Sequence, residues 1–96
     1  MKIHELKIKK CYYEDILSYK KEFEIRKDDR DFEVDDLIHF SVIEPFVYEE
    51  VLTSTKQLYK IKYILRNCED YGLKKGYCIL GISRAYDQRW NVDTAR

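Results

Sequence analysis

Residues 20–32 have the sequence KKEFEIRKDDRDF, and the first half of this stretch alternates between apolar and charged side chains. Because successive side chains of a β-strand point to opposite faces, Phe23 and Ile25 are predicted to share one face, and Glu24 and Arg26 the other. The apolar pair is then expected to enter a core, while the charged face meets a cleft or solvent. The alternative is a solvated, salt-bridged edge strand, since runs of charge usually mark exposed faces. The pattern therefore predicts a strand over 22–27 and leaves its role open.

The segments on both sides of this strand predict more β-structure and one helix. Leu6 and Ile8 alternate with lysines, which indicates a short first strand. Apolar residues recur at three- and four-residue spacing after Tyr12, so residues 12–20 are expected to form an amphipathic helix. The remaining strands are expected at residues 38–43, 46–51, 58–65 and 77–83.

The connections follow from turn-forming residues. Thr53-Ser54-Thr55 is the expected hairpin loop, and residues 67–76 form a polar loop in which Gly72 and Gly76 are expected to take positive φ angles. In the strand over 58–65, alternate residues from Tyr59 to Leu65 are expected to share one face.

Short strands with one or two short helices predict a mostly β fold, specifically a small antiparallel β-barrel. Closing the sheet hides its edges. The barrel is expected to comprise residues 1–84, followed by a loosely ordered tail over residues 85–96.

Composition and cysteine spacing narrow the kinds of ligand and the location that are expected. The chain has 18 basic and 18 acidic residues, so its formal net charge is zero and any anion site must come from local clustering. No apolar run approaches the roughly 20 residues of a membrane span, and the start has no apolar signal region, so a cytoplasmic location is expected. Cys11, Cys68 and Cys78 lack CxxC spacing and are expected to be reduced thiols, with no metal site and no cofactor.

Four stretches of the chain form a set of motifs, namely His4-Glu5-Leu6-Lys7, the stretch over 20–32, Val34-Asp35-Asp36-Leu37, and residues 72–82 with the sequence GLKKGYCILGI. Together they resemble the ASCH superfamily, in particular its small bacterial and phage subfamily of unknown function. The resemblance implies a PUA-like β-barrel and recognition of RNA or a nucleotide in a cleft. Asp35 stands where the subfamily has a turn glycine, but aspartate tolerates a left-handed conformation. Asp28 stands where the subfamily often has asparagine.

One branch of the superfamily is an amidohydrolase that removes the acetyl group from N-acetylcytidine. Its K-x-x-T-I-R stretch matches this chain at Lys21 and Arg26, but Glu24 replaces the nucleophilic threonine. A carboxylate cannot inherit the role of that hydroxyl, so the mechanism does not carry over intact. For the distant glutamate of that branch, Glu69 or Asp70 would only be a guess.

Five residues are predicted to bind a ligand. Lys21 would act as a point charge on phosphate or a carbonyl oxygen, Arg26 as a planar fork, and Glu24 as an acceptor for a base amino group. Lys27 and Arg30 are expected to contact backbone phosphates. For each residue of this cluster, a surface or structural ion pair is the alternative. If the protein is an enzyme, Lys21 and Glu24 are the catalytic candidates.

Three functions compete at this point. The first is RNA or nucleotide binding, the second is hydrolysis of a modified nucleoside, and the third is a phage or host protein contact. His4 and His39 are weaker acid–base candidates and are more often structural. Tyr48 and Tyr71, on presumed loops, are candidates for stacking on bases.

Overall fold

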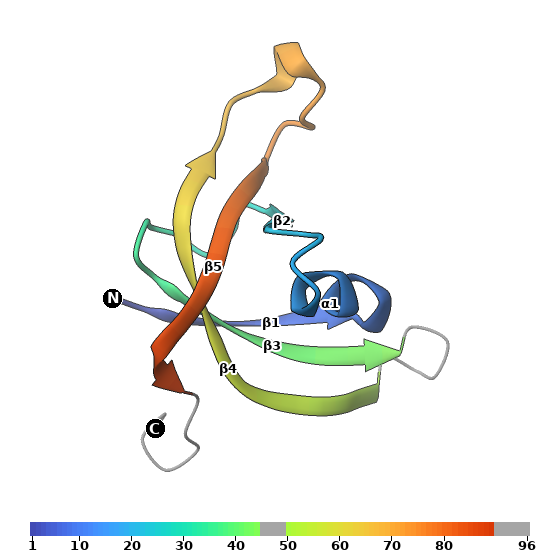
Figure 1. Cartoon of the computed structure of the whole chain (residues 1–96). Coiled ribbons are helices and arrows are strands. Elements are labelled where there is room, and N and C mark those ends of the chain that lie inside the picture. Colours follow the sequence, from blue (N-terminus) through green and yellow to red (C-terminus); the bar gives the residue numbers. More distant parts are fainter. Residues whose placement is uncertain (45–49, 90–96) are drawn as a thin grey trace.

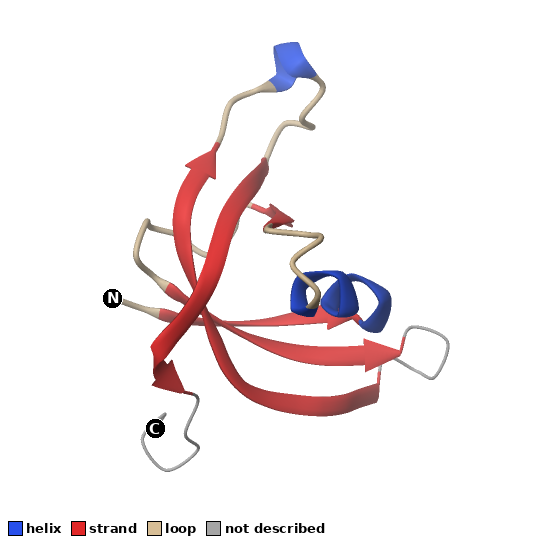
Figure 2. Cartoon of the chain, viewed as in Figure 1, coloured by secondary structure: helices blue, strands red, loops and turns tan. Residues whose placement is uncertain are grey.

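The computed structural model describes the backbone of residues 1–44 and 50–89 and the side chains of residues 1–44 and 56–86. Within these ranges the chain is mostly β-structure with one short α-helix, as the sequence predicted (Figures 1 and 2). The elements are β1 (Ile3–Lys9), α1 (Lys10–Leu17), β2 (Phe23–Lys27), β3 (Leu37–Glu44), β4 (Glu50–Leu65), the 3-10 helix η1 (Glu69–Tyr71) and β5 (Tyr77–Arg89).

The five strands form one curled sheet in the order β1-β3-β4-β5-β2. β1 and β3 are parallel, because α1 and β2 lie between them in the chain, and the other pairs are antiparallel. The sheet forms a half-barrel, and α1 lies on its open side beside the end of β1 (Figure 1). The curl brings the edge strands close enough that the Arg26 side chain of β2 donates a hydrogen bond to the backbone carbonyl of Lys7 in β1.

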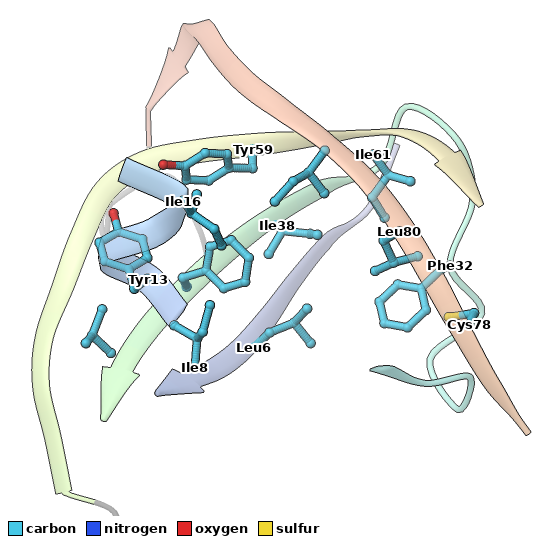
Figure 3. Packing of buried hydrophobic residues seen from close by; sticks show 13 residues of the cluster. Leu6, Ile8, Tyr13, Ile16, Phe32, Ile38, Tyr59, Ile61, Cys78 and Leu80 are labelled. Atoms are coloured by element: carbon cyan, nitrogen blue, oxygen red, sulfur yellow. The ribbon is translucent and has the colours of Figure 1, made fainter. Parts of the chain in front are cut away.

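The core fills the concave side of the sheet. Tyr13 and Ile16 of α1 point toward the strands (Figure 3). Phe40 is fully buried, and its ring centre lies 6.0 Å from that of Tyr13 and 5.5 Å from that of Tyr59, separations at which aromatic pairs add to the effect of burial. The predicted inward faces of the strands at both ends of the chain and of β3 are confirmed, since the following residues are buried: Leu6, Ile8, Ile38, Phe40, Val42, Cys78, Leu80 and Ile82.

The predicted facing of β2 is wrong. Glu24 is 6% exposed, whereas Phe23 is 42% and Ile25 is 52% exposed. Glu24 lies directly opposite Leu80 in the antiparallel β2–β5 pair, and directly opposite residues share a face of the sheet. Because Leu80 belongs to the core, the charged face of β2 turns inward and the apolar face turns outward.

β4 also differs from the prediction. Thr53-Ser54-Thr55, the predicted hairpin loop, lies within β4, and of the strand predicted over 46–51 only residues 50 and 51 belong to the described β4. The register of β4 against β5 shifts between Ile61 and Tyr63, and an irregularity of this kind reverses the alternation of side chains. Tyr63 is therefore exposed, and Ile64 packs against the core instead.

β5 is longer than the sequence predicted. It continues to Arg89, and Ala85 is buried, so the strand includes residues 85–89 of the segment that was predicted as a tail. Residues 90–96 lie outside the described part of the chain. In the loop before β5, Gly72 and Gly76 have φ angles of 96° and 84°, which confirms the predicted positive φ at both positions.

A buried carboxylate connects the start of β1 to the turn before β3. Asp36 Oδ2 lies 2.8 Å from His4 Nε2, and the carboxylate accepts hydrogen bonds from the backbone N–H groups of Lys2 and Glu33, each at 3.0 Å. The preceding Asp35 has a φ of 76°, which confirms that aspartate holds this turn. His4 therefore has a structural partner.

The pKa of Asp36 makes acid stability depend on this contact. Burial alone would raise the pKa of Asp36, but the hydrogen bonds from His4, Lys2 and Glu33 together outweigh it and lower the pKa. The unfolded chain then takes up the proton first, so the stabilisation is present above about pH 4 and is lost as the pH falls through the lower folded-state pKa. Urea unfolding from about pH 7 to about pH 3 should show a smaller loss for Asp36→Asn than for the wild type. Parallel losses in the two proteins would contradict this assignment.

Candidate functional site

Three charged side chains that the sequence singled out lie together on the concave side of β2. Glu24 Oε1 accepts a hydrogen bond from Lys21 Nζ at 2.5 Å, and Oε2 accepts one from Arg26 Nη1 at 3.3 Å. The Glu24 carboxylate is buried, and the Lys21 side chain is only 14% exposed. A carboxylate removed from water needs such partners, since an uncompensated buried charge is strongly unfavourable. We call these residues the Lys–Glu–Arg cluster.

The end of α1 positions Lys21. The helix ends at Leu17, and Tyr19 takes a left-handed φ of 62°. The backbone N–H of Lys21 donates back to the Asp15 carbonyl at 3.0 Å, so the chain turns sharply from the helix into β2. Lys21 Nζ also donates to the Phe23 carbonyl at 2.8 Å, which fixes the ammonium group beside the cluster.

Two arginines bridge the open side of the half-barrel. Arg26 Nη1 donates to the Lys7 carbonyl at 2.9 Å, and Arg30 Nη1 donates to the Glu5 carbonyl at 2.9 Å. These carbonyls belong to β1, an edge strand, where outward backbone groups have no neighbouring strand to pair with. The arginines therefore hold the two edges of the sheet together and keep Arg26 next to Glu24.

The Lys–Glu–Arg cluster lines a cavity of about 470 Å³, which we call the central cavity. Aliphatic side chains from three strands line it as well, namely Ile8, Ile25 and Ile43. Its volume falls in the range of small-molecule sites, which are mostly apolar with a few fixed polar groups.

Aromatic and cationic groups complete the central cavity. Tyr12 and Phe23 line it, and Lys21 Nζ lies 5.5 Å and 5.0 Å from their respective ring centres. Lys7 and Lys9 of β1 are also in its lining. Among the described lining residues there are thus four cations and one carboxylate, so the cavity favours an anionic ligand although the whole chain is neutral.

The structure separates the other two predicted ligand contacts from the central cavity. Arg30 lines a neighbouring hollow of about 380 Å³ that shares Lys7 and Arg26 with it. Lys27 is exposed opposite Tyr77 on β5 and lines neither of these two spaces. Lys21, Glu24 and Arg26 are therefore brought together, Arg30 lies one hollow away, and Lys27 lies apart.

The weaker candidates also lie apart from the central cavity. His39 is buried in β3. Glu69, Asp70 and the exposed Tyr71 form η1, which lies in the loop between β4 and β5, far from α1 (Figure 1). Tyr48 lies outside the described residues.

Sequence reasoning missed what β1 and α1 add to the cavity. The alternation at residues 6–9 assigns Lys7 and Lys9 only to the polar face of a strand, and the helical spacing assigns Tyr12 only to an amphipathic helix. Lys7, Lys9 and Tyr12 line the same cavity as the cluster. They do so because the sheet curls until β1 and β2 approach each other. Arg26 and Arg30 were the available signal in the sequence that β1 and β2 approach each other. Their acceptors, however, are backbone carbonyls, which no pattern of side chains reveals.

The three cysteines all lie within the described residues. Cys11 is exposed, Cys68 is half-buried and Cys78 is buried, and all three are free, as predicted. Burial raises the pKa of the Cys78 thiol, which disfavours the reactive thiolate. Among the described residues no group of three or more His, Cys, Asp or Glu side chains is placed to hold a metal ion.

Sequence comparison places the chain in a family. The family described as "Domain of unknown function (DUF3850)" matches residues 3–82, from β1 to the middle of β5. The chain belongs to this family. The matched segment of this family member contains the whole Lys–Glu–Arg cluster and all the described lining of the central cavity. No curated protein matches the sequence. None of the described helices is long and apolar enough to cross a membrane.

Proposed function

We propose that the chain binds a nucleotide or a short single strand of RNA in the central cavity. The observation that carries this proposal is the buried Glu24 carboxylate, held between Lys21 and Arg26 in a cavity with aromatic walls. This combination offers polar recognition and a stacking surface in one small space. The resemblance of the sequence to the ASCH superfamily, with its PUA-like barrel, supports the same conclusion.

The cluster has hydrogen-bonding capacity left for a base. An ionised carboxylate has about four acceptor positions, and Lys21 and Arg26 use one on each oxygen of Glu24. A remaining lone pair would accept the exocyclic amino group of cytosine or adenine, as carboxylates do in base recognition. Tyr12 and Phe23 would stack on the base, which contributes to binding without demanding one sequence.

The net charge of the protein limits how many phosphates of an RNA strand it can bind. Lys7 and Lys9 are available for phosphate contacts at the cavity. Because the whole chain is neutral, we expect roughly two to four phosphates to be engaged, so the affinity for a single strand should fall gently with salt.

Titration calorimetry with the four nucleoside monophosphates tests the proposal. CMP and AMP are expected to bind more tightly than UMP, because uracil presents a carbonyl oxygen to Glu24 where cytosine presents an amino group. A short oligonucleotide should then show the gentle salt dependence described above. Absence of binding by all four at about 1 mM, or tight binding of long duplex RNA with a steep salt dependence, would contradict the proposal.

Replacing Lys21 with alanine should affect both binding and stability. We expect nucleotide affinity to fall about tenfold, because one charge-assisted contact is lost. The free energy of unfolding should fall by about 1–2 kcal/mol, since Arg26 is then the one remaining partner of Glu24 among the described side chains. The matched control is Lys20→Ala, which changes an exposed neighbour and should stay within about 0.5 kcal/mol of the wild type. Equal affinities in the two variants would remove Lys21 from the binding site.

One contact favours a hydrolase of modified nucleosides as the alternative. The Lys21 ammonium and the Glu24 carboxylate lie side by side in the cavity, where Lys21 would polarise an amide carbonyl and Glu24 would activate water. A covalent route lacks its nucleophile at position 24, and among the described lining residues only Tyr12 carries a hydroxyl. Incubation with N-acetylcytidine decides between the two. Release of cytidine that is lost in Lys21→Ala would replace the binding-only proposal.

A further inference from the structure

A second cavity lies on the other side of Lys21. It has a volume of about 420 Å³ and is lined by residues of α1 and the turn after it, of β4 and of β5. Lys21 lines both this space and the central cavity, so the two share one cation. Each is large enough for a small-molecule ligand. We call the second space the Arg84 cavity.

Arg84 is held in place by neutral groups. Its Nη2 donates to the Leu17 carbonyl at 2.7 Å, and its guanidinium lies 4.5 Å from the centre of the Tyr19 ring. Within the described part of the chain, no carboxylate forms an ion pair with Arg84. A planar guanidinium that is fixed by a carbonyl and a ring, and that forms no ion pair with a described carboxylate, is suited to binding an oxyanion in two-point geometry.

The walls of the Arg84 cavity suit an aromatic ligand that carries negative charge. The hydroxyls of Tyr19 and Tyr86 lie 3.0 Å apart, so the two exposed rings form one rim of the cavity. Lys62 adds a third cation beside Lys21 and Arg84, against Glu22 as the one carboxylate among the described lining residues. Burial raises the pKa of Tyr59, also in the lining, to about 12, so its hydroxyl adds no negative charge at neutral pH.

We propose that the Arg84 cavity binds the next nucleotide of the same strand, so that the preferred ligand is at least a dinucleotide. This inference rests on the proposed function of the central cavity. One nucleotide lies in the central cavity, the phosphodiester passes Lys21 between the two spaces, and the outer phosphate meets Arg84. The neighbouring base stacks on Tyr19 or Tyr86, as bases do on aromatic platforms of single-strand binders.

Calorimetry with CMP and with the 5′-phosphorylated dinucleotide pCpC tests this inference on the full chain. The dinucleotide is expected to bind at least about tenfold more tightly than CMP, because it adds a stacked base and a charge-assisted contact. Arg84→Gln should remove most of this gain and leave CMP binding unchanged. Lys75→Gln, which neutralises an exposed lysine in the loop before β5, should change neither affinity.

A second variant keeps the test decisive if Arg84→Gln fails to fold. Tyr86→Ala removes an exposed side chain from the rim and should also reduce the dinucleotide gain without affecting CMP. Equal affinities of wild type for CMP and pCpC, or an equal loss for both ligands in the variants, would overturn the second subsite while the central site stands. If neither ligand binds the wild type, the proposed function itself fails and the inference fails with it.

Discussion

Replacing Glu24 with alanine is expected to lower the free energy of unfolding by about 2–4 kcal/mol and to abolish nucleotide binding. The variant leaves Lys21 and Arg26 without the buried carboxylate that lies between them, and removing one partner of a buried ionic contact is strongly destabilising. Urea unfolding measures the first effect, and calorimetry with CMP the second.

The control for this variant is Glu22→Ala. Glu22 is exposed and lies two residues away on the approach to the same strand, so its loss should stay within about 0.5 kcal/mol. Similarly small losses of unfolding free energy in both variants would show that Glu24 is solvated, which is the alternative that the sequence pattern left open. The Lys–Glu–Arg cluster would then not contribute to stability.

Phe40→Ala is expected to have the largest effect on stability, about 3–5 kcal/mol. The Phe40 ring is fully buried and contacts Tyr13 of α1 and Tyr59 of β4, so the variant leaves a cavity beneath the helix. For a small domain with a total stability of about 5–15 kcal/mol, this loss should lower the melting temperature by many degrees.

The same substitution at an exposed position provides the comparison. Phe23→Ala removes an equal side chain from β2, where it is 42% exposed, and should cost about 1 kcal/mol or less. A loss at Phe23 equal to that at Phe40 would mean that the apolar face of β2 is buried after all, contrary to the observed register with β5.

Local sequence patterns predicted most of the fold, because the spacing of apolar residues indicates which face of a strand or helix is buried. The alternations at Leu6–Ile8, Ile38–Val42 and Cys78–Ile82 identified three strands with their buried faces. The spacing after Tyr12 identified α1, although the helix begins at Lys10 and ends at Leu17. In each of these elements the apolar residues face the core, which is the assumption behind the pattern.

The prediction of strand faces failed in β2 and β4. In these strands either the apolar residues do not face the core or the alternation of side chains is interrupted. Alternation in β2 separates two faces but does not say which one is buried. Here the buried face carries Glu24, which is paired with Lys21 and Arg26. In β4 the register shift after Ile61 reverses the alternation, and no residue type marks it in the sequence. Thr53-Ser54-Thr55 resembles a turn by composition, but it pairs with β3 as strand.

Only the part of the candidate site that is local in the sequence was predicted. Lys21, Glu24 and Arg26 are neighbours in sequence, so the pattern could propose that they act together. Lys7 and Arg84 come from opposite ends of the chain. Lys7 reaches the central cavity through the curl of the sheet, and Arg84 lies in the second cavity because β5 extends beyond the predicted strand. Contacts of this kind depend on tertiary structure, and a single sequence carries no local signal for them.

An NMR titration of the ¹⁵N-labelled protein with CMP tests the central claim most directly. The account predicts that amide shifts concentrate in the segments that line the central cavity, around Lys7, Tyr12 and residues 21–26, and that the Arg26 side-chain signal moves with them. Signals from η1, which is distant from the cavity, should stay in place. Shifts centred on η1 or on the outer face around Tyr63, or no shifts at about 1 mM CMP, would contradict it.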